Sequence, residues 1–149
     1  MIGLDADFYG AMSPKFNGQE KLGPVWGAIQ QKKIEFGFGP DTVMVGATRA
    51  ASDATDGLLN QFVGIQVSEL PADLRGLNIL EISAGTYATF EHIGGMDKLV
   101  ESTQKFYNEL LPGMGCTVDN GLHLEIYDER FDMSSADSIM TIAAPIAQN

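Results

Sequence analysis

Residues 121–127 combine an acid, an imidazole and a phenol at alternate positions. In a β-strand, successive side chains point to opposite faces, so His123, Glu125 and Tyr127 would share one face and three aliphatic side chains the other. The aliphatic face must pack against a hydrophobic core. A carboxylate withdrawn from water on the opposite face is costly unless something compensates its charge, and a ligand could be that partner.

Two interpretations of Glu125 follow from this spacing. In the simpler one the face is solvated and Glu125 is an ordinary surface acid. In the other, Glu125 is buried and a ligand is its partner. In the empty protein, burial would then raise its pKa and leave it partly protonated, or hydrogen-bonded to a tyrosine hydroxyl or a water. A metal site is not indicated, because zinc needs three or four positioned ligands and His123 with Glu125 supplies two at best.

The composition is that of one globular domain. Hydrophobic residues make up 44% of the 149 positions and charged residues 19%, which suits a folded protein with its own core. One cysteine, Cys116, excludes an internal disulfide and fits a reducing compartment. No signal-peptide pattern and no membrane-spanning apolar run are visible. We therefore expect a single cytoplasmic domain over residues 1–149, with no membrane association.

The charge of the chain argues against nucleic-acid binding. The formal net charge is −11, and the nine Lys and Arg residues are scattered, with Lys32 and Lys33 the only adjacent pair. DNA-binding proteins need clustered basic residues to neutralise phosphates. An acidic surface raises the local concentration of cations or merely aids solubility, and the charge alone does not decide between the two. We expect no DNA affinity.

The spacing of apolar residues predicts two amphipathic helices. Residues 96–111 place apolar side chains at spacings of three and four, between Gly94-Gly95 and Pro112-Gly113. The other helix begins at about residue 19 or 24 and ends near 34, with Trp26 on its apolar face and Pro24 tolerated in its first turn. Strand-like segments are residues 2–9, 42–48, 61–70, 79–82, 86–92, 122–128 and 138–146.

The order of these elements is strand, helix, strand, strand, repeated once. It predicts an α+β fold in which two such units, about residues 1–70 and 71–149, pair about a pseudo-twofold axis. The strands would form an antiparallel sheet with two helices, and a ligand cleft would lie between the halves.

Six short motifs in the second half, together with Trp26 and the strand 64–67, resemble the GyrI-like small-molecule-binding family. The motifs are Leu70-Pro71, Gly85-Thr-Tyr-Ala-Thr-Phe90, His92-Ile-Gly94, Leu111-Pro-Gly-Met-Gly115, Leu124-Glu-Ile-Tyr127 and Ala144-Pro-Ile146. This family supplies the effector-binding domain of AraC- and MerR-type multidrug transcription regulators, and the chain is also similar to cationic-drug-binding integron cassette proteins. It departs from the family pattern at Val63, Leu110 and Cys116.

The resemblance implies a domain that binds bulky, hydrophobic, often cationic drug-like molecules in the cleft, without a cofactor or metal. It makes the strand glutamate, Glu125, the electrostatic anchor and aromatic side chains the cleft walls; our candidates are Tyr127, Tyr87, Trp26, Phe62 and Phe90. With few residues before the first strand, we expect a stand-alone copy that sequesters drugs or signals to a separate regulator.

Two alternative functions remain open at this point. Glu125 near tyrosine hydroxyls could act as a general base that activates water, and some GyrI-like proteins are similar to hydrolases of electrophilic, alkylating compounds. The acidic surface could instead inhibit a protein such as gyrase, for which the family is named.

Overall fold

The computed structural model describes residues 1–147, which form one antiparallel sheet covered by two helices. The strand order is β4-β1-β3-β2-β6-β7-β5, and every neighbouring pair is antiparallel. The strands are β1 (Ile2–Phe8), β2 (Met44–Ala50), β3 (Leu59–Ile65), β4 (Asn78–Ile79), β5 (Tyr87–Ile93), β6 (His123–Tyr127) and β7 (Ile139–Pro145).

The two halves of the sheet repeat each other in reverse, which confirms the predicted α+β fold. From one side the order is β1-β3-β2, and from the other it is β5-β7-β6. The halves join where β2 pairs with β6, and there Gly46 lies opposite Glu125. The short strand β4 pairs with β1 at the edge of the first half. Glu125 therefore lies on the central seam of the molecule.

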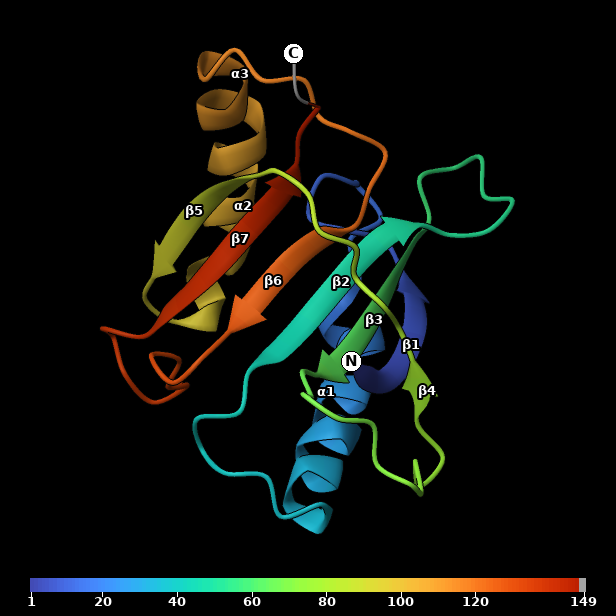
Figure 1. Ribbon diagram of the computed structural model, residues 1–149. Helices are drawn as coiled ribbons and strands as arrows, with labels where there is room; N and C mark the ends of the chain where they lie inside the picture. The colour runs from blue at the N-terminus through green and yellow to red at the C-terminus, as the bar shows by residue number, and fades with distance from the viewer. Residues whose placement is uncertain (148–149) are drawn as a thin grey trace.

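One helix belongs to each half, and both cover the same side of the sheet (Figure 1). The first is α1 (Gly18–Glu35). The second runs through four successive segments, η1 (Met96–Lys98), α2 (Leu99–Lys105), the π-helical turn η2 (Phe106–Leu110) and α3 (Leu111–Gly113). No helix within residues 1–147 is long and apolar enough to cross a bilayer.

The start of α1 corrects one expectation. The helix begins at Gly18, so Pro24 lies inside it rather than in its first turn. The Oδ1 atom of Asn17 accepts a hydrogen bond from the Tyr9 N–H at 2.7 Å, which fixes the chain just before the helix. Leu22 is buried one turn later, and its packing offsets the backbone hydrogen bond that Pro24 cannot donate.

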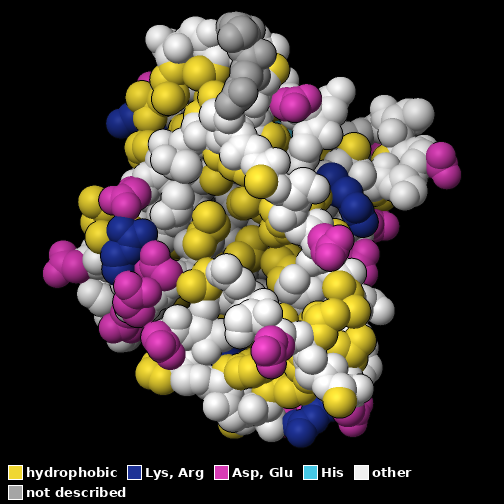
Figure 2. All heavy atoms as spheres, viewed as in Figure 1, with side chains coloured by type: hydrophobic (Ala, Val, Ile, Leu, Met, Phe, Trp, Pro, Cys, Tyr) yellow, Lys and Arg dark blue, Asp and Glu magenta, His cyan; other side chains and the backbone are white. Residues whose placement is uncertain are grey.

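Hydrophobic cores form on both sides of the sheet. The larger one lies under the helices and includes Ile29, Phe106 and Leu111. The smaller one lies on the opposite side, where residues 80–87 cross the sheet and contribute Leu80, Ile82 and Tyr87. Figure 2 shows apolar side chains in the middle of this second face, surrounded by charged ones.

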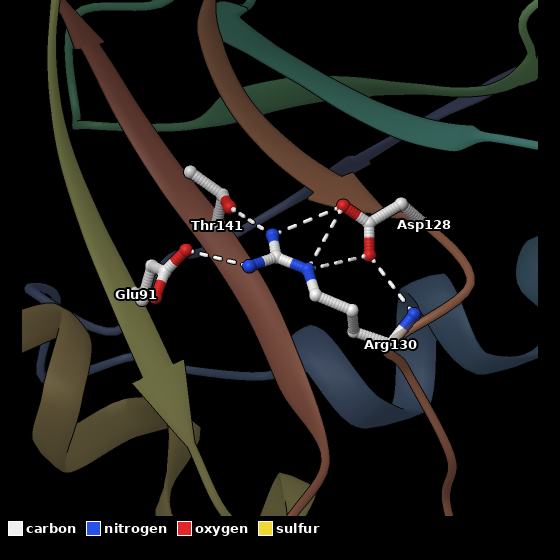
Figure 3. A network of polar contacts seen from close by, with 4 residues as sticks. All are labelled: Glu91, Asp128, Arg130 and Thr141. Atoms are coloured by element: carbon white, nitrogen blue, oxygen red, sulfur yellow. Dashed lines mark hydrogen bonds and ion pairs between the residues drawn. The ribbon is translucent and has the colours of Figure 1, made fainter.

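An arginine holds the connection between β6 and β7 in place (Figure 3). The guanidinium of Arg130 donates to both oxygens of Asp128 at 3.0–3.2 Å, to Glu91 on β5 at 2.6 Å and to Thr141 on β7 at 3.4 Å. These hydrogen bonds lower the pKa of Asp128. The connection that Arg130 fixes also carries Phe131, which enters the site described next.

Candidate functional site

A large cavity of about 1550 Å³ lies between the helices and the sheet. Ligand pockets commonly span about 300–1000 Å³, so this cavity can take a bulky molecule. Its walls come from one stripe of α1 (Gln19, Gly23, Trp26, Gly27, Gln30 and Lys33), from the second helix and from β6. Exposed apolar side chains such as Met12 and Met133 also line it.

Strand β6 places its three predicted chemical side chains on this cavity. His123, Glu125 and Tyr127 all line it, while Leu124 packs in the smaller core on the opposite side. The Tyr127 hydroxyl donates a hydrogen bond to Glu125 Oε2 at 2.8 Å. Burial raises the pKa of Glu125, and this hydrogen bond opposes the rise. The expected link between Glu125 and a tyrosine hydroxyl is therefore confirmed.

Glu125 differs from Asp56 and Asp128, two other acids that line the cavity, because no cation compensates its charge. Within residues 1–147 it makes no ion pair, whereas Asp128 pairs with Arg130 at 3.0 Å and Asp56 with Lys15 at 3.6 Å. The second oxygen, Oε1, accepts no hydrogen bond from the described residues. The only fully buried side-chain polar atom without a partner there is Asn60 Oδ1, so Glu125 Oε1 retains accessible surface. A carboxylate with one free oxygen thus faces the cavity.

An aromatic wall stands beside this carboxylate. The Trp26 ring lies edge-on to Tyr127, with centroids 4.9 Å apart, and Phe131 also packs edge-on to Tyr127, at 4.8 Å. Aromatic faces attract cations by about 0.5–2 kcal/mol each. Trp26 and Tyr127 were predicted for this role. Phe131 was missed, because it sits in an irregular connection where no periodicity marks it.

Gln61 fixes the position of Trp26. Its Oε1 accepts from Trp26 Nε1 at 3.3 Å, and its Nε2 donates to Thr48 Oγ1 at 3.0 Å. The Gln61 side chain is 1% exposed and lies across Gly46, where an added Cβ would come within 3.0 Å of it. Gly46 therefore leaves the space in which Gln61 holds the indole. The only sequence signal for Gln61 was that it is polar while the residues two positions before and after it in β3, Leu59 and Val63, are apolar.

A second polar pair lies at the start of β6. Tyr107 Oη and His123 Nδ1 are 2.6 Å apart, and the π-helical turn η2 carries Tyr107 to this point. Burial, and then the charge of Glu125, raise the pKa of Tyr107. Burial lowers the pKa of His123. The sequence indicated Tyr107 only as part of an apolar helix stripe and left its hydroxyl without a role.

The structure does not bring the other three candidate aromatics to this cavity. Phe62 is buried in the smaller core on the opposite side of the sheet, because it alternates with Gln61 and Val63. Phe90 stacks on Phe106 at 5.8 Å in the larger core. Tyr87 lines a separate depression of about 310 Å³ beside residues 81–86.

The second histidine is structural. His92 is 2% exposed, and its ring nitrogens contact Ser102 Oγ at 2.6 Å and the Gly95 carbonyl at 2.9 Å. Among the described residues, no three His, Cys, Asp or Glu side chains gather as metal ligands.

Comparisons with known proteins agree with this architecture. The family model of the GyrI-like small molecule binding domain matches residues 10–147. No curated protein is similar enough to this chain to count as a relative.

Solved structures with the same fold share little sequence with the chain. The structure of SAV2435 bound to tetraphenylphosphonium has a TM-score of 0.72 and 16% identity, covering 98% of this chain and 87% of that one. A putative bacterial transcription regulation protein from Staphylococcus aureus has a TM-score of 0.68 and 15% identity, covering 99% and 91%. The Vibrio cholerae integron cassette protein VCH_CASS2 has a TM-score of 0.62 and 17% identity, covering 98% and 88%.

Proposed function

Because the chain belongs to the family of GyrI-like small molecule binding domains, we propose that its ligands are bulky hydrophobic cations bound in the cavity, with Glu125 as the electrostatic anchor. One observation carries the proposal: Glu125 faces the cavity beside Trp26 and Tyr127 and has no ion-pair partner among residues 1–147. A bound cation would supply the charge that the surrounding protein does not.

The walls of the cavity suit a delocalised cation better than a compact one. A small inorganic or ammonium ion loses strong hydration on entry, whereas a lipophilic cation brings apolar surface that gains from burial. Met96, Leu99 and Val100 of the second helix also line the cavity and offer such apolar surface. The tetraphenylphosphonium bound by SAV2435 belongs to the same class of ligand.

We assign the protein a role in ligand capture, either sequestering such cations or relaying their presence to a separate regulator. Its net charge of −11 opposes direct contact with nucleic acid and raises the concentration of cations near the surface.

The proposal predicts a charge-selective rise in melting temperature. Tetraphenylphosphonium and tetraphenylborate have nearly the same shape and opposite charge. The cation should stabilise the protein increasingly as its concentration rises, by about 2.7 kcal/mol at one hundred times its Kd. The borate should not stabilise it. Thermal-shift titrations with both ions check this. Equal stabilisation by the two ions would show that the site does not select charge.

A cavity-filling variant identifies where the cation binds. Gly27 lies on the cavity-lining stripe of α1, and a Cβ added there meets no atom within 4 Å. Leu is a better helix former than Gly by about 1 kcal/mol or somewhat less, so Gly27→Leu should fold at least as well as the parent. It should also abolish the shift caused by tetraphenylphosphonium. An unchanged shift would place the cation elsewhere.

A further inference from the structure

The cavity presents a second polar group in addition to Glu125, on the same face of β6. His123 and Glu125 are two residues apart on the strand, which separates their side chains by about 7 Å. Both line the cavity. The His123 ring is tied to the second helix through Nδ1, which lies 2.6 Å from Tyr107 Oη. Its orientation is thereby fixed, and the other nitrogen, Nε2, makes no hydrogen bond within residues 1–147.

The chemistry of the Tyr107–His123 pair decides what Nε2 can do. A phenol is a better proton donor than a neutral imidazole, and an imidazole nitrogen is a far better acceptor than a phenol oxygen. The Tyr107 hydroxyl therefore donates to Nδ1, and the ring proton sits on Nε2. Burial lowers the pKa of His123, which favours this neutral form. Nε2 is a hydrogen-bond donor held in a fixed direction.

The Nε2 donor also retains accessible surface. The only fully buried side-chain nitrogen or oxygen without a partner in the described part of the chain is Asn60 Oδ1, so His123 Nε2 is not sealed off. The cavity thus presents a free carboxylate oxygen and, about 7 Å along the strand, a free N–H donor.

We propose that His123 forms a second subsite, which takes a hydrogen-bond acceptor of a ligand whose positive charge lies at Glu125. The preferred ligands are lipophilic cations that carry a carbonyl or ether oxygen about 7 Å from the charged centre, the separation of alternate side chains on a strand. This inference rests on the proposed function, because Glu125 must first fix the cation.

A matched pair of cations tests the subsite. The (4-ethoxy-4-oxobutyl)triphenylphosphonium ion carries an ester on a side chain of seven atoms, and heptyltriphenylphosphonium replaces it with methylenes. For the wild type and for His123→Phe, calorimetry gives the affinity ratio of ester to heptyl ligand. We expect His123→Phe to lower this ratio about fivefold, the effect of one ordinary hydrogen bond.

Two further variants distinguish the loss of the His123 hydrogen bond from effects of Tyr107 and of Glu125. His123→Phe leaves the Tyr107 hydroxyl without its acceptor. The double variant Tyr107→Phe/His123→Phe removes both partners of that hydrogen bond and leaves apolar side chains at both positions. It should lower the affinity ratio to the same value as His123→Phe. Glu125→Gln should weaken both ligands and leave the ratio unchanged.

The outcomes distinguish the two proposals. A ratio that is unchanged or raised in both His123 variants overturns the acceptor subsite, even if both cations still depend on Glu125. If neither cation binds the wild type, or if Glu125→Gln affects neither, the cation site itself is wrong and this inference with it.

Discussion

Replacing Glu125 with Gln should weaken the binding of tetraphenylphosphonium at least tenfold, which corresponds to about 1.4 kcal/mol. Gln keeps the size of the side chain and can still accept the Tyr127 hydrogen bond, which is 2.8 Å long in the parent. The substitution removes the charge that attracts the cation. Fluorescence titration through Trp26, the only tryptophan in the chain, measures the change.

A neutral ligand is the control for this substitution. Triphenylphosphine oxide, a triaryl compound without net charge, should bind the parent and Glu125→Gln within a factor of two of each other. A matching loss of both ligands would mean that the variant has altered the cavity rather than its charge. An undiminished affinity for the cation would show that Glu125 is not the anchor.

The stability of the empty variant follows from the sign of the pKa shift. Burial raises the pKa of Glu125 in the folded state, so its contribution to stability is fully present below the unfolded pKa and is lost as the pH rises through the folded value. Gln does not titrate. The variant should therefore be at least as stable as the parent at neutral pH, with the difference shrinking in acid. Urea denaturation at several pH values tests this and excludes misfolding as the cause of weak binding.

Replacing Phe106 with Ala should lower the free energy of unfolding by about 3–5 kcal/mol, the usual cost of a buried Phe→Ala change. Phe106 is 1% exposed, stacks on Phe90 at 5.8 Å and meets Tyr107 edge-on at 5.1 Å. The substitution removes the aromatic stacking between the second helix and β5. Chemical denaturation followed by circular dichroism gives the value.

An exposed aliphatic residue supplies the comparison for Phe106. Ile34, at the end of α1, is 71% exposed, and Ile34→Ala should change the free energy of unfolding by less than about 0.5 kcal/mol. Similar losses in both variants would contradict the central position of Phe106 in the larger core.

The periodicity of apolar residues along the sequence predicted much of the fold. Alternation in β6 predicted which side chains would share a face with Glu125, and the structure places His123 and Tyr127 there. The stripe over residues 96–111 predicted the second helix, and the repeated element order predicted the two related halves of the sheet.

Which residues make up the site could not be predicted from periodicity. Alternation assigns a residue to a face but not to a position on it, so Phe90 was a candidate for the cavity although it lies under Phe106. Gln61, Tyr107 and Phe131 reach the site through β3, a π-helical turn and an irregular connection. Their proximity depends on how distant segments pack, which no local pattern records.

The most direct test of Glu125 as the anchor is proton release on binding. Tetraphenylphosphonium has a fixed charge, so any protons released come from the protein. A bound cation favours the ionised carboxylate, which reverses the upward shift in the pKa of Glu125. Affinity should therefore strengthen as the pH rises through that raised pKa, and binding below it should release protons.

Isothermal titration calorimetry in two buffers of different ionisation enthalpy counts those protons. We expect the wild type to release a proton fraction that falls to zero above the raised pKa of Glu125. Glu125→Gln should lack this release and keep only any contribution of His123, which both proteins share. Equal proton release and equal pH dependence in the two proteins would contradict the assignment of Glu125 as the cation anchor.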